Sequence, residues 1–543
     1  MTTREVRRIS LNGPEFLGSG LNVTDNPLIV PPTEMVESTN ILIGSTLARK
    51  KRGGQDYLNT DSSDALASYP LNPKNNGGTD GDPILGLYEF WRYDSGSGAP
   101  KSTLMVRQGT KIWAISSRTG VAVDLTGALT LPSTGEVTFQ AFEGKLYWAS
   151  TNTLEGYNTW DGVAGAATAA TVPPDGTPST IIAHGGRMWA FGVPGFPYRI
   201  YYSEFYDGQA WATTPFGQTG TAAEAGSLDL DPFGDPLGIT GAVSFQDRLY
   251  VYLKRASFEI TGNTINNFIV KTISRQIGCI GHRTIVPIAN DIIYASERGI
   301  LRMSSTDKAI ESEYGFISRP ISRIWNENID RELGGQFSAT YDEQENLYLL
   351  SCATKGSTEN DVILAFNAQA TLWAGTWEGI RARTLATYVV EGKNRVIAGR
   401  EDGVISLTGT PGRLDLGFPY TSKFKTGILY PNGEMDIQFI WKTATVLAST
   451  NGDATVTFNA FVDTEQKATR TIQIASGKDL LGSTFILGQS KLGNGVFVPQ
   501  TMSLKGSGYG LQLEVIFNTE DEVEVYGFFA SAIEADQKIG ATV

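Results

Sequence analysis

A short pattern, a polar turn followed by an aliphatic and then an aromatic residue, recurs along the middle of the chain. In the clearest copy, Gln246-Asp247-Arg248 precedes Leu249-Tyr250-Val251-Tyr252. The aromatic position is filled by Trp113, Tyr147, Trp189, Tyr250, Tyr294 and Tyr348, and Ile397 takes it in a seventh copy. A polar turn that leads into alternating apolar residues is typical of a β-hairpin feeding a buried inner strand. We therefore expect Tyr250 to be a packing residue, so that its loss costs stability rather than activity.

The spacing of these copies predicts a repeat architecture. Neighbouring copies lie between 34 and 61 residues apart (147 − 113 and 250 − 189), and propeller blades of four strands take roughly 40 to 50 residues. A second alternating segment follows the copies, for example at 199–202 and 362–366, and is expected to be a third strand. The pattern predicts an all-β chain with a divergent six- or seven-bladed β-propeller over 83–410. The longest spacing predicts an inserted acidic loop at 213–236.

The two ends of the chain lack this repeat. Residues 1–82 are punctuated by Asn and Pro turns and predict an extended N-terminal arm that lies across another surface, with a long loop at 61–82. Residues 411–543 contain longer alternating segments at 455–462, 511–517 and 523–532, which predict a C-terminal β-sandwich-like domain. The best helical pattern, at 320–332, places Ile321, Ile324 and Trp325 on one face.

Composition narrows the classes of function. The formal net charge is -13 and the aromatic share is 10%, which disfavours tight nucleic-acid binding but not the passage of DNA along an acidic wall. Cys279 and Cys352 are too few for a disulfide framework, and two buried thiols are favoured over one disulfide. We expect no membrane span and no signal peptide, and therefore synthesis in the cytoplasm.

The sequence offers few candidates for catalysis or metal binding. The two histidines, His184 and His282, each adjoin glycine and are expected to be hydrogen-bonded turn residues, although a Ser-His-Asp arrangement is not excluded by spacing. No nucleophile elbow, zinc-protease or P-loop motif is present. Asp229, Asp231 and Asp235 could bind a hard cation but are more typical of a solvated acidic loop. We predict no catalytic residues, no cofactor and no metal.

Two further clusters leave alternatives open. The run Arg49-Lys50-Lys51-Arg52 could contact phosphate or dock to an acidic partner, or it could form an exposed turn closed by Gly53-Gly54. The aromatic residues Tyr201, Tyr202 and Trp211 could form a sugar-stacking platform, although structural packing is favoured. The nearby residues 203–211 carry the letters of a sialidase Asp-box at the wrong spacing.

The N-terminal segment resembles the opening of tail nozzle proteins of short-tailed, podovirus-type bacteriophages. The residues that carry this resemblance are Gly20-Leu21-Asn22, Asn26-Pro27, Pro31-Pro32, Glu34, Asn40, Gly44, Leu47, Arg49 and Gly53-Gly54. The motif lies within residues 18 to 54, and it departs from the family by one extra residue between Gly44 and Leu47 and by a longer basic run. The layout of arm, propeller and β-rich region is similar over nearly the whole length.

The resemblance implies a structural virion protein rather than an enzyme. Nozzle proteins form a hexameric ring below the head-tail adaptor ring of the virion tail, with tail fibres or a needle as possible further partners, and genomic DNA leaves through the lumen without sequence-specific binding. The residues leave two alternatives: a propeller-type glycan-binding or glycan-cleaving tail protein, and a propeller scaffold for protein partners.

Overall fold

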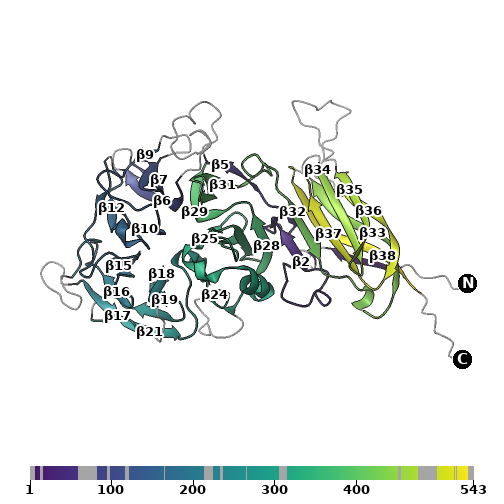
Figure 1. Cartoon of the computed structure of the whole chain (residues 1–543), viewed down its shortest axis with the longest axis horizontal. Coiled ribbons are helices and arrows are strands. Elements are labelled where there is room, and N and C mark those ends of the chain that lie inside the picture. The colour runs from purple at the N-terminus through teal and green to yellow at the C-terminus, as the bar shows by residue number, and fades with distance from the viewer. Residues whose placement is uncertain are drawn as a thin grey trace, which may run out of the picture.

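The structure, a computed structural model, is built almost entirely from antiparallel strands (Figure 1). The residues it describes are 7–12, 16, 18–58, 82–94, 98–116, 122–163, 165–212, 224–232, 237–264, 266–304, 315–433, 435–450, 454–474, 498–518, 520 and 522–535. The all-β prediction is confirmed. Helical turns in the described part are short: η3 (Thr153–Glu155), η5 (His282–Thr284), η7 (Arg319–Ile321), η8 (Ile324–Asn328), η9 (Arg331–Gln336) and η10 (Pro431–Gly433).

Seven small antiparallel sheets succeed one another between residues 84 and 410, and we call them together the small-sheet body. Within each sheet, strands that follow in the chain lie side by side, as in a meander. Sheet 1 contains β6 (Ile84–Asp94), β7 (Ala99–Gln108), β8 (Lys111–Ile115) and β9 (Val123–Asp124), and sheet 2 contains β10 (Val137–Phe142), β11 (Lys145–Ser150), β12 (Asn158–Trp160) and β13 (Thr168–Ala169). Sheet 3 contains β14 (Thr180–His184), β15 (Arg187–Phe191), β16 (Arg199–Tyr202) and β17 (Gly226–Asp229). Sheet 4 contains β18 (Ile239–Phe245), β19 (Arg248–Leu253), β20 (Ser257–Thr261) and β21 (Ile269–Ser274).

The remaining three sheets complete the small-sheet body. Sheet 5 is β22 (Val286–Ile288), β23 (Asp291–Ala295), β24 (Ile300–Ser304); sheet 6 is β25 (Ser338–Asp342), β26 (Leu347–Cys352), β27 (Val362–Asn367), β28 (Leu372–Glu378); and sheet 7 is β29 (Ala382–Val390), β30 (Lys393–Arg400), β31 (Ile405–Thr410). The fourth strand of sheet 7 comes from the far N-terminal side of the chain: β5 (Gly54–Tyr57) pairs antiparallel with β31.

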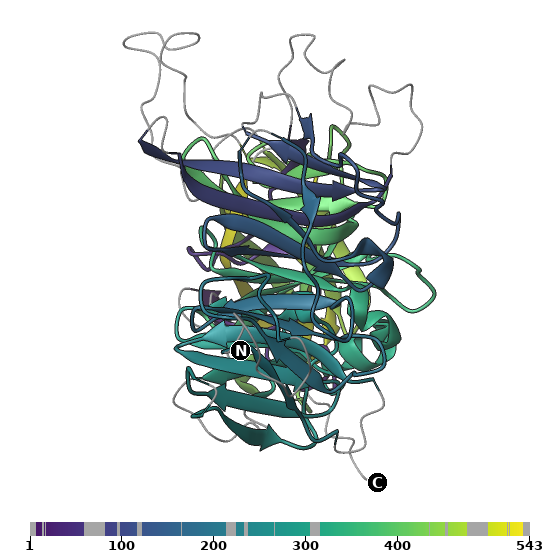
Figure 2. The same ribbon diagram turned by 90° about the vertical axis from the view of Figure 1, so that its left-hand side faces the viewer.

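Apolar side chains lie between each sheet and the next. The first strands β6, β10, β14 and β18 contact one another in order, η5 contacts β18 and β25, and β29 contacts both β25 and β6. One buried cluster includes Ile84, Val106 and Trp113 of sheet 1 together with Tyr388 and Ile397 of sheet 7, so the last small sheet packs on the first. A single sheet buries neither of its faces alone, which makes neighbouring sheets depend on each other. Figure 2 views this body from its side.

The repeated turn-and-aromatic pattern lies in largely buried strands that have a neighbouring strand on both sides, as expected for inner strands of a sheet. Six copies fall in β11, β15, β19, β23, β26 and β30, each the second strand of its sheet. The copy at Trp113 falls in β8, the third strand of sheet 1. The first strands are the ones that contact one another from one sheet to the next, and their sequences carry no such signature. The predicted third strands at 199–202 and 362–366 are confirmed as β16 and β27.

We expect Tyr250→Ala to lower the free energy of unfolding by about 3 kcal/mol, near the low end for aromatic truncation in a core. Tyr250 is 6% exposed and packs with Tyr252, Ile292 and Tyr294 between sheets 4 and 5. Urea denaturation followed by circular dichroism measures the loss. An unchanged midpoint for this variant would mean that the packing between these sheets is not as described.

The C-terminal residues form two larger sheets around a shared core, which we call the C-terminal body. One sheet is ordered β3 (Ile41–Leu42), β4 (Arg49–Lys51), β38 (Val523–Glu534), β33 (Phe439–Thr450), β36 (Val498–Gly508), with β1 (Arg7–Asn12) also pairing to β38. The other contains β32 (Ser422–Thr426), β37 (Leu511–Phe517), β34 (Ala454–Val462) and β35 (Glu465–Ile474). Alternation of buried and half-exposed residues along β33 and β34 explains why each sheet has one face in the core.

The N-terminal arm joins the two bodies. Strand β2 (Met35–Thr39) pairs in parallel with β28 at Thr39 and antiparallel with β32, so sheet 6 and one C-terminal sheet form a single nine-stranded sheet. The arm therefore supplies strands to both bodies, as Figure 1 shows for β2 and β5. The loop predicted at 61–82 lies outside the described residues except for Asp82.

Candidate functional site

The basic run Arg49-Lys50-Lys51-Arg52 is buried, and both of our expectations for it were wrong. Arg49, Lys50 and Lys51 form β4, and all four residues are at most 7% exposed. The run is thus neither an exposed turn nor a surface for phosphate or an external acidic partner. It lies where the arm, sheet 6, sheet 7 and the C-terminal body meet, a region we call the joint.

Arg52 has partners for all of its donors. Its Nε donates to Asn40 Oδ1 at 2.9 Å, Nη1 to Gly53 O and Asp415 Oδ1 at 2.9 Å each, and Nη2 to Glu378 O at 2.8 Å and Asp415 Oδ2 at 2.5 Å. The guanidinium stacks 3.9 Å from the ring centroid of Tyr420. Only a planar fork of five N–H groups can make this set of contacts, so lysine would not substitute.

Arg49 is fully buried, and no described acidic residue forms an ion pair with it. Its Nη2 donates to the main-chain oxygens of Phe16, Ser19 and Thr33, and its guanidinium lies 3.8 Å from the ring centroid of Phe16. Burial away from a counter-charge disfavours the protonated form and lowers the pKa of Arg49 to about 9. Arg49 thereby fixes three separate points of the preceding chain.

Lys50 and Arg413 hold acidic residues of both bodies together. Lys50 Nζ lies 2.9 Å from Glu522 and 3.9 Å from Glu345, and Arg413 Nη2 lies 3.0 Å from the same Glu522 carboxylate. These residues line a cavity of about 180 Å³ between sheets 6 and 7 and the C-terminal body. Its lining carries three basic and three acidic side chains, so the formal charges of the cavity balance.

Close backbone approaches explain several glycines of the arm. A Cβ on Gly20 would lie 2.7 Å from Trp373 O, and one on Gly53 would lie 2.5 Å from Gly409 Cα. A Cβ on Gly54 would collide with Leu414 O. Asn40 adopts a left-handed φ of 56° while its side chain accepts from Arg52 and Glu378 N, a conformation that asparagine tolerates better than most residues.

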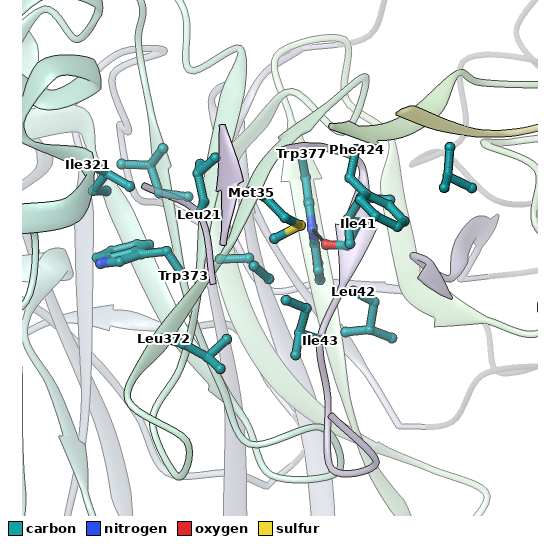
Figure 3. Close-up of a cluster of buried hydrophobic side chains, with 14 of the residues drawn as sticks. Leu21, Met35, Ile41, Leu42, Ile43, Ile321, Leu372, Trp373, Trp377 and Phe424 are labelled. Atoms are coloured by element: carbon teal, nitrogen blue, oxygen red, sulfur yellow. Dashed lines mark hydrogen bonds between the residues drawn. The ribbon is translucent and has the colours of Figure 1, made fainter. Parts of the chain in front are cut away.

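Apolar packing completes the joint (Figure 3). Leu21 and Met35 of the arm lie in the same buried cluster as Trp373, and Ile41 lies beside Trp377. Trp377 Nε1 donates to Ile41 O at 2.7 Å, which ties the polar end of this indole to the arm. The joint therefore combines apolar burial, ion pairs and tight main-chain contacts, which suits a rigid connection.

The aromatic residues proposed as a sugar platform are buried. Tyr201, Tyr202 and Trp211 are 1%, 2% and 7% exposed. Tyr201 donates to Asp175 Oδ2 at 2.5 Å, and Trp211 Nε1 donates to Thr171 O at 2.8 Å. Their ring faces are occupied by neighbouring core residues, so packing rather than ligand stacking explains this cluster.

The segment predicted as an inserted acidic loop at 213–236 is partly a strand, because Gly226–Asp229 form β17, and it shows no cation site among the described residues. Asp229 is paired with Arg199, whose Nε lies 2.7 Å from Asp229 Oδ1. Asp231 is described and has its own interaction partner, and Asp235 lies outside the described residues. No cluster of three or more potential His, Cys, Asp or Glu ligands occurs in the part of the chain that the structure describes.

Both histidines are hydrogen-bonded residues in the small-sheet body. His184 Nδ1 lies 2.8 Å from Ser244 Oγ, but no described carboxylate is hydrogen-bonded to the His184 ring. A Ser-His pair without an orienting acid is an incomplete triad. His282 Nδ1 accepts from Ala242 N at 3.3 Å. Cys279 and Cys352 are buried free thiols, as expected, and burial raises the pKa of both.

Stability should fall on acidification because the partly buried His282 is held in its neutral form. Desolvation, with a smaller contribution from Arg283, lowers the pKa of His282 from 6.5 to about 4. The unfolded chain therefore binds a proton between these values that the folded chain does not, and stability present above pH 6.5 is lost as the pH falls toward 4. Between pH 7 and 5 we expect this residue alone to cost about 2 kcal/mol.

Denaturation of the wild type and His282→Asn at both pH values measures this contribution. The variant keeps an acceptor near Ala242 N but has no titrating group, so its stability should fall less on acidification. Equal losses in the two proteins would show that the His282 ring is not desolvated as described.

Two further sets of paired charged residues could not be predicted from the sequence. Glu136, directly before β10 of sheet 2, forms ion pairs with Arg283 of η5 and with Arg383 of sheet 7, the latter at 2.9 Å. Arg283 also donates to Leu85 O of sheet 1 at 3.3 Å. Separately, Arg107 and Glu155 form a fully buried pair between sheets 1 and 2. Only the fold brings these residues together.

Comparison with protein-family models found no match. Comparison with curated proteins found none either. In the described residues, no helix has the length and apolarity needed to cross a membrane.

Proposed function

We propose that this chain is a structural virion protein, the ring-forming nozzle of a short phage tail that continues the DNA-ejection channel below the head-tail adaptor. One observation carries the proposal: several of the residues that resemble the nozzle opening also fasten the arm at the joint. Gly20, Asn40, Arg49 and the Gly53-Gly54 pair each make a contact that another residue type would lose. The resembling motif thus has a mechanical role in this chain.

In this proposal the small-sheet body is a seven-bladed β-propeller. The seven successive meander sheets, the packing of sheet 7 on sheet 1 and the completion of sheet 7 by β5 support this interpretation. The C-terminal body corresponds to the β-sandwich-like domain, with the arm running between the two. A rigid joint suits a protein that must transmit load along a tail without an active site.

The proposed DNA path runs between copies of the chain rather than through the small-sheet body. Glu136, directly before β10, forms ion pairs with Arg283 of η5 and Arg383 of β29, so charged side chains link these elements. A lumen built by six acidic chains would let a polyanion slide, because like charge prevents adhesion. Tyr201, Tyr202 and Trp211 are buried and cannot stack on a sugar. No observation on the described residues therefore favours the glycan-binding alternative.

Negative-stain electron microscopy of the purified chain, alone and mixed with its adaptor ring, tests the proposal. We expect rings with an axial opening that stack on the adaptor. A chain that stays monomeric with the adaptor and does not occur in purified particles would contradict it. Glycan-array binding together with sugar release would favour the alternative.

A further inference from the structure

Another cavity of the molecule, of about 550 Å³, lies where three separate segments of the small-sheet body meet. They are the turn between β23 and β24, the chain from η8 to η9, and the loop between β26 and β27. Main-chain hydrogen bonds hold two of these segments together: Asp330 N donates to Ala353 O at 2.9 Å, and Lys355 N donates to Asn328 O at 2.7 Å. The side chains that line this cavity, which we call the η9 cleft, therefore project from fixed positions.

Three basic side chains line the η9 cleft, one from each segment: Arg298, Arg331 and Lys355. Arg331 Nη1 donates to Glu297 O at 2.6 Å and to Asn326 Oδ1 at 3.3 Å, and Lys355 Nζ donates to Asn326 O at 2.9 Å. These acceptors are all uncharged oxygens. No described acidic residue forms an ion pair with any of the three cations, and the Arg298 guanidinium has no hydrogen-bond acceptor among the described residues. The cleft therefore offers charged donors that the described residues leave uncommitted.

The acidic side chains of the η9 cleft are held mainly by two other cations. Glu297 lies 3.0 Å from both Lys254 Nζ and Arg255 Nε, and Glu332 lies 3.6 Å from Lys254 Nζ. Asp330 accepts from Glu332 N at 3.2 Å. The lining together with Lys254 and Arg255 has five basic and three acidic side chains, a local excess of two positive charges (5 − 3). The cavity at the joint differs, because two of its cations pair with acids of its own lining.

We propose that Arg298, Arg331 and Lys355 bind a small oxyanion of the phosphate type in the η9 cleft, a site that goes beyond the proposed function. Guanidinium groups donate paired hydrogen bonds to phosphate oxygens, and an ammonium group adds a compact charge with up to three donors. A volume of about 550 Å³ suits a small ligand. Because the donors come from three segments, the bound anion links sheet 5 to sheet 6 and stabilises the folded chain.

Isothermal titration calorimetry of the full chain with inorganic phosphate at low ionic strength tests the inference. We expect Arg298→Ala/Lys355→Ala to bind phosphate at least about tenfold more weakly than the wild type, because two charged donors are lost. Glu332→Gln removes a negative charge from the lining and should strengthen binding several-fold. Arg323→Ala/Lys393→Ala removes the same charge from exposed positions outside the lining and should leave binding unchanged. This control separates a built site from the overall charge of the chain.

A wild type that binds no phosphate, or equal weakening in the two double variants, would overturn the inference. Binding of a short DNA oligonucleotide without binding of inorganic phosphate would also overturn it and would favour a nucleic acid as ligand. Competition by glucose 1-phosphate would assign the site to phosphate monoesters, and its failure to compete would assign the site to the free ion; either result supports the site.

Melting curves give a second measurement of the same site. Phosphate should raise the Tm of the wild type more than that of Arg298→Ala/Lys355→Ala. The comparison between proteins removes the general stabilising effect of phosphate salts. Both positions are exposed, so unchanged circular dichroism of the variant shows that its fold is intact. An equal rise of Tm in the two proteins would contradict a specific site.

Discussion

Glu155→Ala is expected to lower the free energy of unfolding by about 4 kcal/mol, because it leaves a buried arginine without its counter-charge. The Arg107 and Glu155 side chains are both 0% exposed. Arg107 Nε and Nη2 each donate to one Glu155 oxygen at 2.8 Å, and Trp148 Nε1 donates to Oε1 at 3.1 Å. Glu155 thus joins β7 of sheet 1 to η3 and β11 of sheet 2. Urea denaturation followed by circular dichroism measures the effect.

Two variants separate the buried charge from other causes. Glu155→Gln keeps an acceptor for Arg107 but removes the negative charge, so we expect an intermediate loss. Asp124→Ala breaks an ion pair with Lys111 in the same sheet, where the two side chains are 37% and 52% exposed. Exposed pairs contribute less than about 1 kcal/mol. If Asp124→Ala cost as much as Glu155→Ala, burial would not explain the Glu155 effect.

The small-sheet body could be predicted in part because its signals are local. The turn and the alternating residues around Tyr250 or Tyr348 lie within one hairpin, and hairpins are the unit of these sheets. The order of strands was harder to predict. Trp113 follows the same turn pattern as Tyr147 but lies one strand later in its sheet, because β6 and β7 form a long hairpin before it. The pattern predicts a hairpin but not the position of its strands within the sheet.

The joint could not be predicted because its partners are distant in sequence. Four consecutive basic residues normally indicate a solvated surface, since burying a charge without a partner costs several kcal/mol. Their acidic partners Asp415, Glu522 and Glu524 lie more than 360 residues further on. The pairing of β5 with β31 spans a similar separation and leaves no local pattern. The sequence did contain one indication of the joint, the adjacent glycines Gly53 and Gly54. Both lie so close to the main chain of 409–414 that a side chain would not fit.

Arg52→Ala should also cost about 3 to 5 kcal/mol, the range for breaking a buried pair by removing one partner. The Arg52 and Asp415 side chains are 1% and 12% exposed. The change leaves Asp415 without its donor and the Asn40 side-chain oxygen with Glu378 N alone, and it removes the stacking on Tyr420. Because Arg52 holds the arm to both Glu378 of sheet 6 and Asp415, we expect faster proteolysis within the arm as well as lower stability. Urea denaturation and limited proteolysis give the two measurements.

Comparing the loss of stability with the proteolysis of the arm shows whether Arg52 fastens the arm or only stabilises the fold as a whole. Arg52→Lys keeps the charge but has three donors on one atom, so it should recover only part of the loss. Arg323→Ala, in an exposed pair with Glu327, should leave both measurements near the wild type. If Arg52→Ala lowered stability without exposing the arm to protease, β2 and β5 would hold the arm unaided. The arm would then be fastened by its strand pairing alone, and the role that we give the basic run would pass to those strands.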